Sequence, residues 1–273
     1  MKKFLTFLLM IPFLAALVSA QNLNEGLVSY FRMNSSSETF ELDAVQGINN
    51  LTTLTAVTNS VTGKSGTAYL FDRSNSAAVG GDQFYNTTGV GAISIWFEWK
   101  QGYETLQAVG GFYQSSNSFL ALEFDNRTSQ RNNIRAVFIN NNIVKWIIEG
   151  KHNSLYNNIT SGWNNVILTN NGTGPVIYIN GKLLEQDTSI VGTSQHMWMA
   201  NGSTTSNYDV ALGLITGFNA FNGTIDEVGV WNRTLEQIDV DYLYNTGTGI
   251  SPFTNSINVN ITTKKKYIIL KIS

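Results

Sequence analysis

Short hydrophobic runs separated by polar turns fill most of the chain. The runs are rich in Val, Ile and aromatic residues, and Gly, Asn, Ser and Asp stand between them. We expect strands over residues 26–33, 66–72, 91–100, 105–113, 118–125, 134–139, 142–149, 164–170, 175–180, 209–215 and 223–232. No strand–helix alternation is visible, so the pattern predicts an all-β, antiparallel sandwich or jelly roll rather than an α/β fold.

The run 92–99 shows the alternation of a half-buried strand most clearly. Its two faces would carry different side chains: Ile93, Ile95 and Phe97 on one, and Ser94, Trp96 and Glu98 on the other. Two further runs, "NNVILTN" and "PVIYIN", are joined by "NNGTG", and the second ends in Asn180-Gly181. Asn-Gly supplies the positive φ angles of tight hairpin turns, so this segment predicts a strand, a turn, a second strand, a second turn and a third strand.

One helix is expected, in "RTLEQIDVDYLYNTG" (233–247). Thr234 with Gln237 three residues later has the arrangement of a capping box, and Gly247 suits the end of the helix. The residues expected on its buried face are Leu235, Ile238, Tyr242 and Leu243.

The two ends of the chain differ from the middle. Residues 1–20 have Lys2 and Lys3, an apolar stretch, and a small-residue ending at Ala20, which is typical of a cleaved signal peptide; an uncleaved anchor is the alternative. After residue 250 the chain has no acid, three consecutive lysines and a β-prone run, Tyr267–Ile272. We therefore divide the chain into a signal peptide (1–20), one domain (21–250) and a basic tail (251–273) that could pair with other chains.

Composition and charge narrow the function classes. There is no cysteine, which excludes disulfides, thiolate metal sites and thiol catalysis. Without the two lysines of the signal and the four of the tail, 11 of the 17 basic residues remain against 19 acidic residues, so the body carries about −8. Such a body is a poor partner for nucleic acid, and no membrane span is expected after the signal is removed.

Five segments, in order, carry a family resemblance: "GLVSYFRMN", "GKSGTAYLFDRSNSAAVG", "ISIWFEWK", "GWNNVILTNNGTGPVIYINGKLL" and "FNGTIDEVGVWNRTLEQIDVDYLYN". Together they resemble a laminin-G-like jelly-roll domain of the concanavalin A-like lectin and glucanase superfamily, over residues 24 to 247. The sequence departs from the family's pattern at Asn164-Asn165, where histidines are common, and at Arg73, where Gly is usual.

The resemblance implies a structural Ca²⁺. Carried onto this chain, the ligands would be Asp226 of the last strand, with Asp43 and Gly47 as helpers. Carboxylate and carbonyl oxygens are the ligands that Ca²⁺ prefers. The alternative is that Asp226 accepts hydrogen bonds from backbone amides, and Glu227, next along the strand, should point the opposite way.

Aromatic residues on polar stretches are the candidate ligand contacts. Trp198 lies in "TSQHMWMANGSTTSNY" beside His196 and Asn201, and Trp99 ends a strand near Tyr103. Exposed aromatics can stack on sugar rings while polar groups orient the hydroxyls. The alternative for each tryptophan is packing over the core.

A catalytic role is the weakest alternative. Glycoside hydrolysis needs two carboxylates across the sugar, and "ALEFD" offers Glu123 and Asp125 on one strand face without the second Glu of the superfamily's glucanases. We therefore expect no enzyme activity.

Among several N-glycosylation sequons, Asn171 and Asn222 stand at expected turns and are the first candidates for a glycoprotein. The favoured hypothesis is a secreted, non-catalytic recognition module that binds a glycan or a cell-surface glycoprotein, as in adhesion. The second is an assembly protein that self-associates through its tail.

Overall fold

The computed structural model describes residues 22–37, 39–45, 47–73, 77–84, 89–100, 105–125, 133–151, 159–187, 192, 194–199, 208–215, 219–249, 251–252, 259–264 and 267–272. The predicted signal peptide lies outside these residues. Chain contacts define one compact body, Leu23–Ser256.

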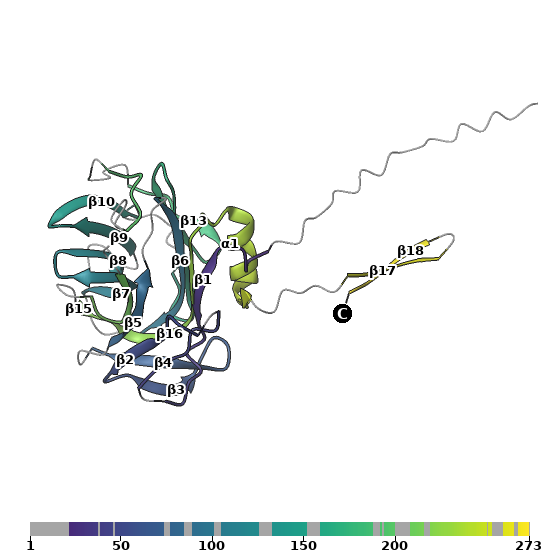
Figure 1. Cartoon of the computed structure of the whole chain (residues 1–273), viewed down its shortest axis with the longest axis horizontal. Helices are drawn as coiled ribbons and strands as arrows, with labels where there is room; N and C mark the ends of the chain where they lie inside the picture. Colours follow the sequence, from purple (N-terminus) through teal and green to yellow (C-terminus); the bar gives the residue numbers. More distant parts are fainter. Residues whose placement is uncertain are drawn as a thin grey trace, which may run out of the picture. The chain divides into compact units, whose positions relative to one another are not determined.

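The body is built from two antiparallel sheets that pack face to face, with one short helix beside them (Figure 1). The first sheet, sheet A, has the strand order β13-β12-β11-β6-β16-β4-β3, and β1 pairs with β16. Its strands are β1 (Leu27–Phe31), β3 (Thr58–Thr62), β4 (Thr67–Asp72), β6 (Val90–Trp99), β11 (Asn164–Asn171), β12 (Pro175–Ile179), β13 (Lys182–Leu183) and β16 (Asn222–Trp231).

Sheet B has the order β10-β9-β8-β7-β14-β5-β2, and the short β15 pairs with β7 in parallel. Its strands are β2 (Leu51–Thr55), β5 (Ala77–Phe84), β7 (Leu106–Ser115), β8 (Ser118–Asp125), β9 (Asn133–Asn140), β10 (Ile143–Glu149), β14 (Tyr208–Leu212) and β15 (Asn219–Ala220). The all-β sandwich predicted from the sequence is confirmed. All eleven predicted strands are present, and β13 is the further strand expected after the Asn180-Gly181 turn, whereas β2, β3 and the two-residue strand β15 were not predicted.

The main core lies between the sheets and follows the predicted alternation. Ile93, Ile95 and Phe97 of β6 belong to this core, whereas Ser94 and Trp96 face the opposite side of sheet A. A second cluster lies on that outer side, where Tyr30 and Trp231 pack with residues of the helix. The Asn180-Gly181 turn joins β12 to β13 with φ values of 49° and 80°, as its sequence predicts.

The helix α1 (Gln237–Tyr244) begins later than its sequence suggested. Its N-cap is Glu236, which forms a capping box with Asp239, so the prediction of a Thr234–Gln237 box is wrong. The Thr234 hydroxyl instead donates to the Asn170 carbonyl oxygen.

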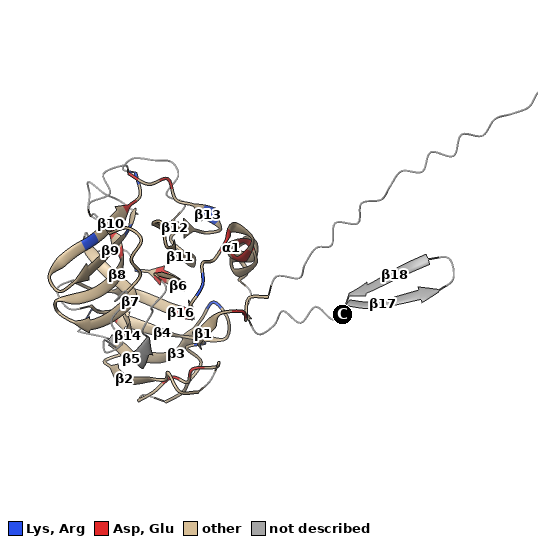
Figure 2. Cartoon of the chain, turned by 45° about the horizontal axis from the view of Figure 1, so that its top comes forward, with Lys and Arg blue, Asp and Glu red and all other residues tan. Residues whose placement is uncertain are grey.

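The buried face of the helix also differs from the prediction. Leu235 and Leu243 are buried as predicted and Val240 is buried in addition, whereas Ile238 is 48% exposed. Asp239 is fully buried and forms a two-pronged ion pair with Arg233 at 2.8 and 2.9 Å. A left-handed Asn245 ends the helix, and the 3₁₀ turn Asn245–Gly247 follows. The acidic residues of the helix are coloured red in Figure 2.

The tail forms a hairpin of its own. β17 (Val259–Lys264) pairs antiparallel with β18 (Tyr267–Ile272), which is the β-prone run seen in the sequence. Across the described residues, no helix combines the length and the hydrophobicity that a bilayer span requires.

Candidate functional site

Hydrophobic and acidic residues exchange their usual places in the loop between β1 and β2. Phe40 is 41% exposed and Leu42 is 55% exposed, whereas Glu41 and Asp43 between and after them are buried. The segment is extended, because isolated bridges pair Glu41 with Leu51 and Asp43 with Phe31, and alternate side chains therefore point to opposite sides. An exposed apolar pair held by buried acids is the kind of exception to normal burial that indicates a binding surface.

Hydrogen bonds from fixed donors hold the two acids inward. The Glu41 carboxylate accepts from the Ser35 amide at 2.9 Å and from the Tyr69 hydroxyl at 2.8 Å. Burial and this neighbouring carboxylate raise the pKa of Tyr69 well above its usual value, which keeps the phenol a donor. Asp43 accepts from the backbone amides of Tyr30 and Val45, both at 3.0 Å. The outward direction of Phe40 and Leu42 is thus fixed by the buried side of the same segment.

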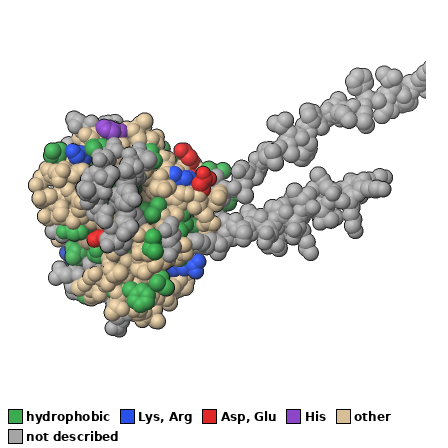
Figure 3. Space-filling model, in the orientation of Figure 1, with side chains coloured by type: hydrophobic (Ala, Val, Ile, Leu, Met, Phe, Trp, Pro, Cys, Tyr) green, Lys and Arg blue, Asp and Glu red, His purple; other side chains and the backbone are tan. Residues whose placement is uncertain are grey.

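These residues line an open cavity of about 420 Å³, which we call the β1–β2 groove; it is lined by Arg32, Asn34, Ser35, Phe40, Leu42, Ala44 and Gly47, with Glu41 and Asp43. The exposed Ile48 (64%) stands next to this segment. The volume is within the range of small-ligand sites, which combine apolar walls with a few orienting polar groups. In Figure 3 most of the visible described surface is polar, and hydrophobic side chains are exposed in small separate groups.

The groove can offer a flat apolar surface and polar groups at its edge. Phe40 and Leu42 supply the first, and the Arg32 guanidinium and the Asn34 amide supply the second. The Asn34 side-chain oxygen accepts from the amide and the hydroxyl of Thr67 at 2.7 and 2.9 Å, which fixes the orientation of its amide group. This combination suits a ligand with an apolar face and hydroxyl groups around its rim.

Trp198, the first ligand candidate from the sequence, is fully buried. It packs edge-on against Phe112, with ring centroids 5.9 Å apart, and a Cβ added to Gly91 would lie 2.2 Å from its indole nitrogen. The prediction that Trp198 is exposed is therefore wrong, and the alternative of packing over the core holds. The loop is tied down because Met197 accepts hydrogen bonds from the Trp146 indole and the Asn170 amide.

The other predicted ligand residues do not form a binding surface around Trp198. Trp99 is 8% exposed, donates its indole N–H to the Thr160 carbonyl oxygen and packs against Phe124, so it also belongs to the core. His196 is exposed. Asn201 and Tyr103 lie outside the described residues.

The described residues around Asp226 do not fit the calcium site that the resemblance implies. The Asp226 carboxylate is fully buried and accepts from the Ser65 and Glu227 amides, as the alternative foresaw. Asp43 is occupied by the amides described above, and Gly47 is exposed. In the part of the chain that the structure describes, no group of three or more His, Cys, Asp or Glu side chains could hold a metal ion, whereas Ca²⁺ takes six to eight oxygens.

Asp226 and Glu227 also depart from the predicted alternation of side chains along β16. Asp226 pairs with Trp96 and Gly229 with Ser94, so three steps along β16 match two along β6, which is a β-bulge. Glu227 adopts a positive φ of 48°, rare for a residue with a side chain. Ile225 and Val228 both belong to the main core, three positions apart, so Asp226 and Glu227 do not point to opposite sides as in a regular strand.

The possible catalytic acids have structural surroundings. Glu123 is fully buried and forms an ion pair with Arg135, its partner across β8 and β9. Asp125 is buried at the end of the same strand. The ion pair joins β8 to β9, and both carboxyl groups are buried.

The two sequons differ in position. Asn171 is exposed at the end of β11, beside the turn to β12, and its side-chain oxygen accepts from the Thr173 hydroxyl at 2.6 Å. Asn222 is only 7% exposed at the start of β16, and its backbone amide donates to Gln107. The expectation of an exposed turn is wrong for Asn222, because the central strand already begins there.

Sequence reasoning missed Phe40 and Leu42. The signal was present in "FELD", where hydrophobic and acidic residues alternate. Alternation alone does not say which set faces the core, and the buried Tyr69 hydroxyl that bonds to Glu41 is distant in sequence.

No protein-family model and no curated protein matches this sequence. Solved structures do match. Domain 4 of AbnA, a GH43 extracellular arabinanase from Geobacillus stearothermophilus, in complex with arabinotriose, superposes with a TM-score of 0.57 at 16% identity, covering 82% of this chain and 98% of that one. The likeness shows the fold, a β-sandwich.

Two other matches belong to larger chains. The receptor binding domain of botulinum neurotoxin type G has a TM-score of 0.54 at 16% identity, over 81% of this chain and 51% of that one. Trypanosoma rangeli sialidase in complex with sialic acid has a TM-score of 0.56 at 14% identity, over 82% of this chain and 34% of that one. This chain thus spans about half of the neurotoxin domain and a third of the sialidase.

Proposed function

We propose that this protein is a secreted, non-catalytic recognition module of laminin-G-like type that binds carbohydrate through the β1–β2 groove. The observation that carries the proposal is the exposed pair Phe40 and Leu42, which the buried acids Glu41 and Asp43 hold outward. The similar solved structures support the ligand class, since one is bound to arabinotriose and another to sialic acid.

Recognition in the groove would divide between two kinds of contact. The C–H face of a sugar ring would pack against Phe40 and Leu42, and its hydroxyls would bond to the Arg32 and Asn34 side chains. The rigid support matters, because a surface that is already oriented loses little conformational entropy when it binds.

The test uses two leucines that differ in place but not in exposure. Leu42 is 55% exposed in the groove, and Leu183 is 57% exposed in β13. A glycan that binds the mature protein is first found by screening arabino-oligosaccharides and sialylated glycans. We expect Leu42→Ala to weaken its affinity by about tenfold or more, and Leu183→Ala to leave the affinity unchanged. Equal losses of affinity in the two variants, or no loss in either, would show that the glycan does not bind in the groove.

A second candidate function, assembly, is favoured by the tail hairpin. β17 and β18 pair only with each other among the described strands, and an isolated two-stranded hairpin is marginally stable in water. Addition to the sheet edge of another molecule would stabilise it. Sedimentation of the mature protein with and without residues 257–273 tests this: a mass that falls on deletion supports assembly, and a monomer in both cases contradicts it.

A further inference from the structure

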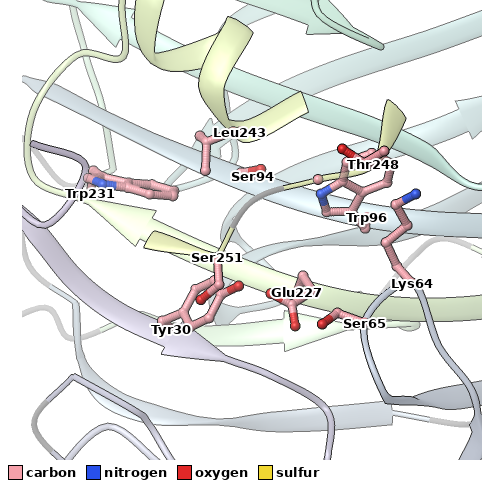
Figure 4. Close-up of a pocket in the computed structure, with 11 residues that line it drawn as sticks. Tyr30, Lys64, Ser65, Ser94, Trp96, Glu227, Trp231, Leu243, Thr248 and Ser251 are labelled. Carbon is pink, nitrogen blue, oxygen red and sulfur yellow. The ribbon is translucent and has the colours of Figure 1, made fainter. Parts of the chain in front are cut away.

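A small cavity lies on the outer face of sheet A, away from the β1–β2 groove. Its volume is about 100 Å³, and its walls come from β1, β6, β16, the turn before β4 and the segment that follows α1 (Figure 4). Gly249 closes one side: a Cβ there would lie 3.2 Å from the Trp96 ring, so its backbone passes close to the indole. The cavity has room for about three water molecules, which excludes a complete sugar ring.

Glu227 is the unexplained group in this cavity. It is 8% exposed, and the β-bulge of β16 places it among the lining residues. No hydrogen bond or ion pair of its carboxyl group is found with any described residue. In Figure 4 the carboxyl group lies between Tyr30, Ser65 and Ser251. A buried carboxyl without a partner is costly, and native structures rarely keep one without a reason.

The nearest cation does not neutralise Glu227. The Lys64 ammonium donates to the Gly247 carbonyl oxygen and lies 4.6 Å from the centroid of the Trp96 ring. In Figure 4 it points away from the Glu227 carboxyl. The Trp96 ring is also stacked on Tyr244, with ring centroids 5.9 Å apart, so the contacts of Lys64 are with Gly247 and with a Trp96 ring that is itself held in place.

The rest of the lining favours an organic cation over a metal ion. A metal such as Ca²⁺ needs many oxygens, and Glu227 is the only carboxylate among the described lining residues. Trp231, Leu243 and Tyr30 supply apolar and aromatic walls instead. Methylene groups pack well against such walls, and the faces of aromatic rings attract cations.

We propose that this cavity binds a primary ammonium group on a short alkyl chain, with the charge against Glu227 and the chain against Trp231 and Leu243. The hydroxyls of Ser65 and Ser251 stand beside the carboxyl and can accept the remaining N–H groups. The end of a lysine side chain, or a free small amine, has this chemistry.

The site should respond to pH because Glu227 must be ionised to bind a cation. Burial raises the pKa of Glu227 to about 7, while an alkylammonium keeps its charge up to about pH 10. Of the other titratable groups, Lys64 and Tyr30 line the cavity and Asp226 is adjacent in the chain. Burial lowers the pKa of Lys64, so its own loss of charge would only add affinity at higher pH.

The experiment is an NMR titration of the full mature protein with ethylammonium chloride in amine-free buffer, following the tryptophan indole N–H signals. With a carboxyl pKa of about 7, the ionised fraction rises from about 3% at pH 5.5 to nearly all at pH 8.5, which predicts a roughly 30-fold gain in affinity. Ethanol, of similar size but neutral, should not bind, and salt at equal ionic strength should cause no saturable shift.

The variant Glu227→Gln should abolish binding, and the control Glu185→Gln, which removes one negative charge from an exposed side chain, should not. Equal binding of ethanol and ethylammonium, unchanged binding in Glu227→Gln, or no saturable shift with the wild-type protein at pH 8.5 would each overturn the proposal. The ethanol comparison is made on the wild-type protein and therefore does not depend on the folding of the variant.

Discussion

Replacement of Glu227 by Gln should change how the stability of the protein depends on pH. Burial raises the pKa of this carboxyl from 4.5 to about 7. Between these values the folded state holds the proton more tightly than the unfolded state, so stability contributed by Glu227 falls as pH rises and then levels off above pH 7. At 1.36 kcal/mol for each pKa unit, the ionised side chain costs about 3 kcal/mol at pH 8.

Glu227→Gln keeps the shape of the side chain and removes the ionisation. The variant should unfold with nearly the same free energy as the wild type at pH 4.5, and at pH 8 it should be more stable by up to about 3 kcal/mol. Urea unfolding, followed by tryptophan fluorescence in acetate and phosphate buffers at several pH values, measures the unfolding free energy of both proteins. A constant difference in unfolding free energy between the two proteins at all pH values would exclude the raised pKa of Glu227, because it would show that the carboxyl titrates alike in the folded and unfolded states.

Four further substitutions test the packing of Trp198 and the difference between a buried and an exposed ion pair. Trp198→Ala should destabilise the fold by about 3–5 kcal/mol, because a fully buried indole is lost; a change below 1 kcal/mol on denaturation would show that the side chain is exposed. Gly91→Ala should destabilise it by about 1–3 kcal/mol, since the added methyl meets the Trp198 ring, and an unchanged melting temperature would contradict that contact. Arg233→Ala should cost about 3–5 kcal/mol, because it removes the cation that forms an ion pair with the buried Asp239. Lys151→Ala, which breaks an exposed ion pair, should cost less than about 1 kcal/mol, and similar values for the two variants in urea unfolding would contradict this difference.

Local pattern was enough to predict most of the fold. The alternation in 92–99 correctly assigned Ile93, Ile95 and Phe97 to the core, because the period of a strand is fixed by its backbone. Helix α1 was located, but its start was misplaced, since both Thr234 and Glu236 can cap a helix and tertiary contacts decide between them.

The site was harder to predict, because it depends on contacts between distant segments. Trp198 stands in a polar stretch, and only the absence of a side chain at Gly91 makes room for its burial. The opposite holds for Phe40 and Leu42, which look like core residues and are turned outward by hydrogen bonds to Glu41 and Asp43. The sequence also does not predict the β-bulge that places Glu227 in a cavity.

The most direct test of carbohydrate recognition through the β1–β2 groove is to map a bound glycan on the isotope-labelled mature protein by amide chemical shifts. Binding in the groove predicts that a saturating glycan shifts the signals of residues 32–48 most strongly and leaves those of β13, and those of Glu227 and Leu243 in the second cavity, unchanged. Shifts centred elsewhere on the body, or none with any glycan of the panel, would contradict it.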